Sequence, residues 1–542
     1  MRKGKTIVIT ASLILAAMIA GCSSNGEKEP AASPSNTAAN SNSGTASSTN
    51  NEVAAPVELN ISLMGIQDGF DAQGAKEDVL FNDLQKKFNL TINPVQVTWN
   101  DWQEKAKVWA ASGQLPDIFP NAIAVDSPAL YASWAKQGVI KALPDDLRKY
   151  PNLARIMELP SIQPLKVDGK FYTVPRMTYN DSSDWILDRP ILYRKDWAAQ
   201  AGFTSEPQSF DEFVAMIKAV QKQHPGTAGI AIMNKDFLNT LFLPTFPEMS
   251  NKKSWTNEDG KWVPSFASSK INDGIKQLRQ LYSEGLLDKD FAIQKEADGF
   301  TKFMNGQAFI SLGGTFANPT NIETFSKANP GVTIADAVGL MNIWPAADGN
   351  RYTFVESPFW SETFFSNKLD DEKFDRALQL IDYMSSEEYS ALAVNGILDT
   401  DYKMEGDKAV SLLKADETLQ KKYPVNSAIG FLAQWHGAFN KAGKAVINTN
   451  PDVAAWQVYD HDMFVKFKQE DKPAPINFDI MLMSTPAKDK LNVNVMDDLV
   501  KVILEKGDPI ELWKATVKGY DAKGLQEAIA EVNAKAEELG IK

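Results

Sequence analysis

The residue types that most often carry catalysis are scarce in this sequence. Its 542 residues include three histidines, His224, His436 and His461, and a single cysteine, Cys22. The histidines are far apart, and none has a metal-binding spacing such as HExxH. The sequence contains no GxSxG elbow, no GxxxxGKS/T phosphate loop and no GxGxxG turn after a strand. These patterns therefore predict no enzyme that depends on histidine, cysteine or a phosphate loop.

Carboxylates are the remaining chemical groups of interest, because the chain has 69 Asp and Glu residues. Two carboxylates suffice for glycoside hydrolysis, yet nothing in the sequence selects one pair, so a polysaccharide-degrading enzyme stays open as an alternative. Two loops, 180–184 and 288–290, carry several oxygen ligands. Both lack the 1-3-5-12 ligand pattern and the glycine of a calcium loop, so no cofactor is predicted, and a structural calcium stays open without support from the sequence.

The amino-terminal residues have the features of an export signal. A basic start, Met1-Arg2-Lys3-Gly4-Lys5, precedes an apolar run from Ile7 to Ala20, which is too short to span a bilayer as a mature helix. Residues 19–22 (Ile-Ala-Gly-Cys) are similar to a bacterial lipobox. We expect residues 1–21 to be a signal peptide and Cys22 to be lipidated, the alternative being an ordinary signal peptide with an incidental cysteine. Residues 22–56 then form the lipidated cysteine and a polar, flexible tether.

The overall composition is that of a globular protein with an acidic surface. The formal net charge is −13, and 44% of the residues are hydrophobic. This charge argues against nucleic acid or an anionic lipid surface as a partner. Since no second apolar run is long enough to cross a membrane, attachment to a membrane would depend on the lipid.

From residue 57 onward, the pattern of apolar residues predicts alternating strands and helices. Residues 57–64 alternate with period two, residues 78–88 have helical spacing, and residues 90–97 again read as a strand. This order predicts an α/β sheet whose ligand crevice lies at the carboxyl ends of the strands. Further along, the patterns predict a strand at 308–316, a hairpin at 255–264, and helices at 101–111, 268–284, 298–305, 371–384, 496–505 and 522–539. Another helix is expected to be capped by Ser209 or Asp211 and to end near His224.

Several motifs resemble those of the family 1 extracellular solute-binding proteins, the lipid-anchored receptors of ABC importers. They occur in the family's order over about 100 residues. The motifs are Ser112–Phe119 (SGQLPDIF), Tyr131–Leu143, Val167–Pro175 (VDGKFYTVP), Leu192–Trp197 (LYRKDW) and Pro207–Phe213 (PQSFDEF).

The resemblance implies a two-lobed periplasmic-binding-protein fold of type II, an α/β fold with discontinuous lobes joined by a hinge. On this basis we expect residues 57–178 and a later segment near 317–358 to form lobe 1. We expect residues 179–316 to begin lobe 2, and residues 359–542 to complete lobe 2 and the hinge. The resemblance further implies a non-enzymatic, monomeric receptor that binds an oligosaccharide and delivers it to the transmembrane subunits of an ABC permease.

A sugar site needs aromatic faces for the apolar C–H faces of the rings and planar polar groups for the hydroxyls. We looked for such residues in predicted loops, because side chains on apolar helix faces usually pack in the core. The aromatic candidates are Trp99, Tyr179, Trp185, Phe316, Trp344, Trp360 and Trp435, and the polar candidates are Arg176, Asp181 and Glu362.

The expected location is the outer face of the cytoplasmic membrane, in a Gram-positive bacterium, with the protein held there by Cys22. Two other ligands remain open within this interpretation: a peptide and an acidic, uronate-containing oligosaccharide. A structural adhesin of the cell surface is a further alternative. The sequence does not identify the sugar.

Overall fold

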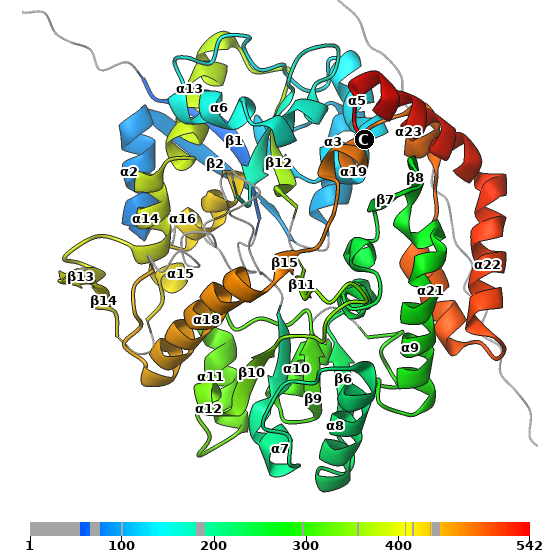
Figure 1. The fold of residues 1–542 in the computed structure, drawn as a ribbon. Helices are drawn as coiled ribbons and strands as arrows, with labels where there is room; N and C mark the ends of the chain where they lie inside the picture. The colour runs from blue at the N-terminus through cyan, green and yellow to red at the C-terminus, as the bar shows by residue number, and fades with distance from the viewer. Residues whose placement is uncertain are drawn as a thin grey trace, which may run out of the picture. The chain divides into compact units, whose positions relative to one another are not determined.

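The structure is a computed structural model. It describes residues 55–64, 76–98, 101–179, 190–294, 298–354, 357–406, 408–414, 417–433, 435 and 445–542. The two largest sheets of these residues, with five and four strands, each have their own hydrophobic core. Below, lobe 1 denotes the five-stranded sheet with the elements packed on it, and lobe 2 denotes the four-stranded sheet with its elements (Figure 1).

The sheet of lobe 1 has the strand order β2-β1-β3-β12-β4. Strands β1, β2 and β3 are parallel, whereas β12 is antiparallel to both β3 and β4. The carboxyl ends of β1 to β4 therefore meet the start of β12 at one edge. The strands are β1 (Val57–Met64), β2 (Leu90–Val97), β3 (Ile118–Asn121), β4 (Thr173–Met177) and β12 (Phe359–Phe365).

Helices from two distant parts of the chain cover this sheet. Figure 1 shows the yellow-green α13 beside the blue and cyan elements of the amino-terminal part. The elements of lobe 1 are α2 (Val79–Phe88), α3 (Trp102–Ser112), α4 (Ile123–Asp126), α5 (Pro128–Lys136), α6 (Pro151–Met157), η1 (Pro160–Leu165), α13 (Asp371–Met384), α14 (Glu387–Asn395), β13 (Tyr402–Glu405), β14 (Lys408–Ser411), α15 (Leu419–Lys422), α16 (Pro424–Ile429) and η7 (Gly430–Leu432).

The sheet of lobe 2 has the order β10-β5-β9-β6, with β5 antiparallel to its two neighbours. Its strands are β5 (Ile191–Arg194), β6 (Ala228–Ile232), β9 (Ala308–Leu312) and β10 (Val338–Met341). Around it lie α7 (Lys195–Gln200), α8 (Phe210–Gln223), η3 (Lys235–Phe242), η4 (Pro247–Ser250), β7 (Trp255–Glu258), β8 (Lys261–Pro264), η5 (Ser265–Ala267), η6 (Ser269–Ile271), α9 (Asn272–Ser283), α10 (Asp298–Met304), α11 (Pro319–Ala328), α12 (Ile334–Ala337) and α18 (Pro451–Glu470).

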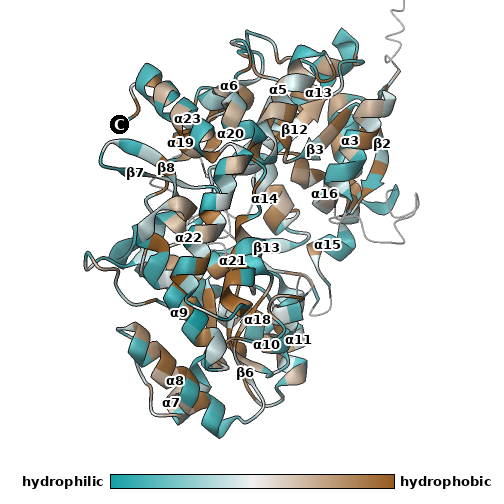
Figure 2. Cartoon of the chain, turned by 90° about the vertical axis from the view of Figure 1, so that its right-hand side faces the viewer, coloured by the Kyte–Doolittle hydropathy of each residue, from teal (hydrophilic) through white to brown (hydrophobic). Residues whose placement is uncertain are grey.

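The last part of the chain is helical and follows a short ribbon of two strands, β11 (Tyr352–Thr353) and β15 (Lys472–Pro473). Its helices are α19 (Phe478–Leu482), α20 (Pro486–Lys490), α21 (Val495–Leu504), α22 (Pro509–Gly519), η8 (Tyr520–Lys523) and α23 (Leu525–Leu539). Apolar residues of α21, α22 and α23 pack into the core of lobe 2. Figure 2 shows hydrophobic and hydrophilic residues alternating along such outer helices.

The division of the chain between the lobes differs from our expectation in two segments. The segment 317–358, which we expected in lobe 1, supplies α11, α12 and β10 to lobe 2. The segment from 359 to 433, which we expected in lobe 2 and the hinge, instead supplies β12, α13 and α16 to lobe 1. The physical reason is the pairing of β12 with both β3 and β4, which places it inside the first sheet.

One buried carboxylate joins the two parts of lobe 1. Asp78 caps α2, since its Oδ1 accepts a hydrogen bond from Phe81 N at 2.9 Å. Its Oδ2 accepts hydrogen bonds from Val425 N and Asn426 N, in the first turn of α16, at 2.9 and 2.8 Å. Burial raises the pKa of Asp78, and these backbone donors oppose that shift. A single side chain thus accepts hydrogen bonds from the first-turn amides of two helices that are far apart in sequence, amides that have no partner within their own helices.

We predict that Asp78→Ala lowers the free energy of unfolding by about 3 kcal/mol, because three buried backbone donors lose their acceptor. The matched control is Asp508→Ala, which removes an exposed cap bonded to Ile510 N and Glu511 N. This control should cost only about 1 kcal/mol. Equal losses in urea titrations of the two variants would contradict the role given to Asp78.

Candidate functional site

Three aromatic side chains from three elements meet at the carboxyl edge of the first sheet. We call them the aromatic platform: Trp102 at the start of α3, Trp360 in β12 and Phe431 in η7. The ring centroids of Trp360 and Phe431 are 5.2 Å apart, and each lies 6.4 Å from that of Trp102. All three pairs meet edge to face. The rings pack on Met64 and Val97, the last residues of β1 and β2.

A cationic side chain lies against this platform. Arg176 in β4 is only 7% exposed. Its guanidinium carbon lies 4.1 Å from the ring centre of Phe431 and 5.2 Å from that of Trp360. The pairing of β12 with β4 shifts register between Phe359 and Glu362. This irregularity contains Trp360, and bulges of this kind commonly redirect a side chain beside a functional site.

The chemistry of the platform suits a polyhydroxylated ring. Trp360 and Phe431 are only partly buried, so part of each ring surface is accessible. Aromatic faces accept the apolar C–H face of a ring, and a guanidinium supplies several fixed hydrogen-bond donors. The geometry therefore supports binding of such a ring.

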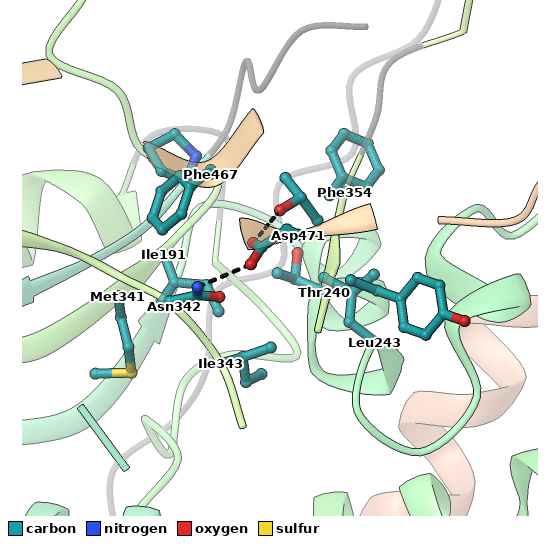
Figure 3. Close-up of a pocket in the computed structure, with 12 residues that line it drawn as sticks. Ile191, Thr240, Leu243, Met341, Asn342, Ile343, Phe354, Phe467 and Asp471 are labelled. Carbon is teal, nitrogen blue, oxygen red and sulfur yellow. Dashed lines mark hydrogen bonds between the residues drawn. The ribbon is translucent and has the colours of Figure 1, made fainter. Parts of the chain in front are cut away.

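The corresponding edge of the second sheet carries a small pocket, shown in Figure 3. The carboxylate of Asp471 accepts hydrogen bonds from Asn342 Nδ2 at 2.9 Å and from Thr353 Oγ1 at 2.6 Å. The volume of the pocket is about 30 Å³, which is the size of a water molecule and too small for a sugar. The other residues shown in the figure, among them Ile191, Met341 and Phe467, are mainly apolar. The Asp471 carboxylate beside this pocket thus joins the two segments that contain Asn342 and Thr353.

Comparison with known proteins assigns the family. Residues 80–398 match the model of the bacterial extracellular solute-binding proteins. The chain belongs to that family. The predicted resemblance is thus confirmed, and the family consists of binding proteins, not enzymes.

Individual relatives are distant. Lipoprotein LipO of Bacillus subtilis is 24% identical over 349 residues, which are 61% of this chain and 65% of LipO. The polygalacturonan/rhamnogalacturonan-binding protein YtcQ of Bacillus subtilis is 22% identical over 351 residues, 62% of this chain and 66% of YtcQ. This solute-binding protein thus matches slightly less than two thirds of the length of either relative.

A solved structure confirms the predicted two-lobed α/β fold. It is an EF-hand mutant of the ABC-transporter substrate-binding protein FusA of Streptococcus pneumoniae, in complex with fructo-nystose. The TM-score is 0.64 at 18% identity, and the match covers 89% of this chain and 99% of the FusA chain. At this level of identity the likeness concerns the fold alone.

Four of the predicted site residues lie at or beside the carboxyl edge of the first sheet. Arg176 and Trp360 belong to the group just described. Tyr179 is buried two residues after β4. Trp435 N donates a hydrogen bond to the carbonyl of Met177, the last residue of β4, at 2.9 Å. Trp99, Asp181 and Trp185 lie outside the described residues.

Two aromatic candidates lie in the core of lobe 2 instead. Phe316 is buried against Phe300, Phe325 and Trp456, and Trp344 packs on the ring of Phe213, 5.1 Å away between centroids. In the described structure their contacts are with other core residues. Ligand contact by either residue stays a prediction.

Sequence reasoning missed Trp102 and Phe431. Both were passed over because the search considered only loops, whereas Trp102 is the first residue of a helix and Phe431 lies in a 3-10 turn. The useful signal was position: Trp102 follows β2 after only four residues. A residue in the first turn of a helix after a parallel strand lies at the ligand edge of the sheet.

Glu362 has a structural position beneath this edge. It is fully buried in β12, and its carboxylate accepts hydrogen bonds from Ala124 N and Val125 N at 3.2 Å each. Burial raises the pKa of Glu362 well above its usual value, and the nearby Asp126 raises it further. The side chain positions α4; its predicted contact with a ligand stays a prediction.

The described carboxylates do not form a metal site. Within the ranges that the structure describes, no group of three or more His, Cys, Asp or Glu side chains is placed to hold a metal ion. In the loop 288–290, Lys302 Nζ lies 2.6 Å from Asp288 Oδ2 and 3.4 Å from Asp290 Oδ2. A lysine thus neutralises these carboxylates. The other candidate loop, 180–184, lies outside the described residues.

We predict that Glu362→Gln changes how stability depends on pH. Because the pKa of Glu362 is raised in the native state, the folded protein retains a proton that the unfolded chain releases above about pH 4.5. The wild-type protein should therefore lose stability relative to the variant as the pH rises from about 5 to 8. Melting temperatures across this range test the sign. Parallel curves for the two proteins would contradict it, and exposed Glu527→Gln is the control.

Proposed function

We propose that this solute-binding protein is the receptor of an ABC importer and binds an oligosaccharide at the aromatic platform. The single observation that carries the proposal is the meeting of Trp102, Trp360 and Phe431 with Arg176 at the carboxyl edge of the first sheet. Closure of lobe 2 over this edge would surround the ligand, and the closed form would dock on the permease.

Sugar binding fits these residues better than peptide binding. Stacking on an aromatic ring uses the C–H face of a pyranose or furanose ring, and partly exposed Trp360 and Phe431 offer such a surface. A peptide bound as an added strand would instead need an unpaired sheet edge. Trp360 belongs to β12, which is paired on both sides with β3 and β4.

The charge of the oligosaccharide is a separate question, and Arg176 favours an acidic one as the second candidate. Guanidinium groups recognise carboxylates through paired hydrogen bonds. By its name, YtcQ binds polygalacturonan and rhamnogalacturonan, whereas FusA was solved with the neutral fructo-nystose. The net charge of −13 would repel a polyanion at long range, so recognition of uronates would depend on local cations such as Arg176.

Attachment to the membrane through Cys22 completes the proposed function. The described residues contain no helix with the length and apolarity needed to cross a membrane. The lipobox-like Ile19-Ala20-Gly21-Cys22 would supply a lipid anchor, and the polar residues up to 56 would tether the receptor on the outer face of the cytoplasmic membrane. Its permease would then be within reach.

The ligand class can be tested with a panel of oligogalacturonates, fructo-oligosaccharides and peptides in a thermal-shift assay. We expect an oligosaccharide to stabilise the protein. A ligand at 100 times its dissociation constant adds about 2.7 kcal/mol to the free energy of unfolding. Oligogalacturonates acting alone would support the acidic ligand. Stabilisation by peptides and by no glycan would overturn the sugar assignment.

We predict that Trp360→Ala weakens binding of the stabilising oligosaccharide about 30-fold, which corresponds to roughly 2 kcal/mol for loss of a central aromatic contact. Calorimetric titration measures this change. Tyr402→Ala, in the β13–β14 hairpin, removes an aromatic side chain away from the platform and is the control. Unchanged affinity in folded Trp360→Ala would rule out the platform as the binding surface.

A further inference from the structure

The short helix α19 contributes side chains to the cores of both lobes. Ile480 is buried in the core of lobe 2, whereas its neighbours Met481 and Leu482 are buried in the core of lobe 1. Phe478, the first residue of the helix, packs against both cores. We call α19 the interlobe wedge. Any change in the angle between the lobes must alter the packing of at least one face of this helix.

The carboxyl end of the wedge is held by one lysine. Lys488 Nζ donates hydrogen bonds to the carbonyls of Ile480 at 2.8 Å, Met481 at 2.8 Å and Met483 at 2.6 Å. These three bonds use all three donors of an ammonium group and satisfy carbonyls that the end of a helix leaves open. Burial lowers the pKa of Lys488 to about 7. The three bonds to carbonyls thus hold the ammonium group of this partly buried lysine in place.

The segment around Lys488 is anchored to both lobes. Helix α20, which contains Lys488, packs on α5 of lobe 1 and on α23, whose apolar face lies in lobe 2. Ala487 N donates to Glu531 Oε2 of α23 at 2.7 Å, and Ser484 Oγ donates to Asp489 at 2.5 Å. The Lys488 ammonium also lies 5.7 Å from the ring centre of Trp255.

A second link between the lobes lies nearby and leads to the aromatic platform. Lys253, just before β7, donates to Val125 O at 3.3 Å and forms an ion pair with Asp126. Asp126 in turn accepts a hydrogen bond from Gln103 Nε2 at 3.0 Å. Gln103 directly follows Trp102 of the platform. The electrostatic influence of Lys253 on Lys488 indicates that the two links are neighbours.

We propose that the interlobe wedge, held by Lys488, sets the angle between the two lobes and so controls the balance between open and closed forms. Loss of the three hydrogen bonds frees the end of α19. The two apolar faces of the helix then no longer keep the two cores in a fixed relative position. The lobes sample a wider range of angles. The effect on ligand affinity rests on the proposed function, whereas the effect on the angle does not.

The test measures the interlobe distance without ligand. In the full chain carrying Cys22→Ser, spin labels are attached at Glu158→Cys, after α6 of lobe 1, and at Lys222→Cys, in the last turn of α8 of lobe 2. Lys488→Met should lengthen the mean distance in double electron–electron resonance and broaden its distribution. Lys490→Met, an exposed lysine two residues further on, should match the parent. An unchanged distribution in Lys488→Met would overturn the proposal.

A second variant covers the case in which Lys488→Met does not fold. Lys253→Met removes the neighbouring link to Val125 and Asp126 and should broaden the same distribution; a parent-like distribution in this variant would count against the proposal. For an oligosaccharide that stabilises the protein, a smaller closed population should weaken apparent affinity about fivefold, because that affinity scales with the competent fraction. If no oligosaccharide binds, the proposed function fails, and the distance measurement still decides the role of the wedge.

Discussion

The carboxylate of Asp471 connects the paths by which the chain crosses between its lobes. It accepts hydrogen bonds from Asn342, which follows strand β10 of lobe 2, and from Thr353, in the crossing that leads to β12 of lobe 1. Asp471 itself begins the later crossing, whose strand β15 pairs with β11. Two connections separated by more than 100 residues in sequence therefore behave as one ribbon. This ribbon therefore helps to fix the position of one lobe relative to the other.

The aromatic platform follows from the direction of the strands. Because β1, β2 and β3 are parallel, the residues that follow them gather at one edge, and Trp102 reaches this edge from α3. Trp360 lies at the start of β12, which runs antiparallel to its neighbours. The pairing of β12 with β4 shifts register at this position. Phe431 comes from a segment that the Asp78 carboxylate ties to lobe 1. The platform thus requires three distant parts of the chain.

The sequence patterns predicted the local elements well and the site only in part. The strands at 57–64 and 90–97 and the helix at 371–384 have the bounds that were expected. The Gly313-Gly314 pair after β9 shows how tertiary packing constrains a loop. A Cβ at Gly313 would lie 2.5 Å from the ring of Phe237, and one at Gly314 would lie 2.2 Å from the ring of Phe300. Both glycines therefore make room for core aromatic rings, which a search for ligand contacts in loops could not recognise.

The sequence by itself determined the family and the α/β alternation, because apolar periodicity and short motifs are local properties. Only the tertiary structure decided which lobe receives each part of the segment from 317 to 433. Residues 317–358 join lobe 2 because β10 pairs with β5, and the later residues join lobe 1 because β12 pairs with strands more than 180 residues earlier. For the same reason, the structure separated Trp360 and Arg176 at the ligand edge from Phe316 and Trp344 in a core. Burial depends on what packs against a side chain, and its partners come from distant parts of the sequence.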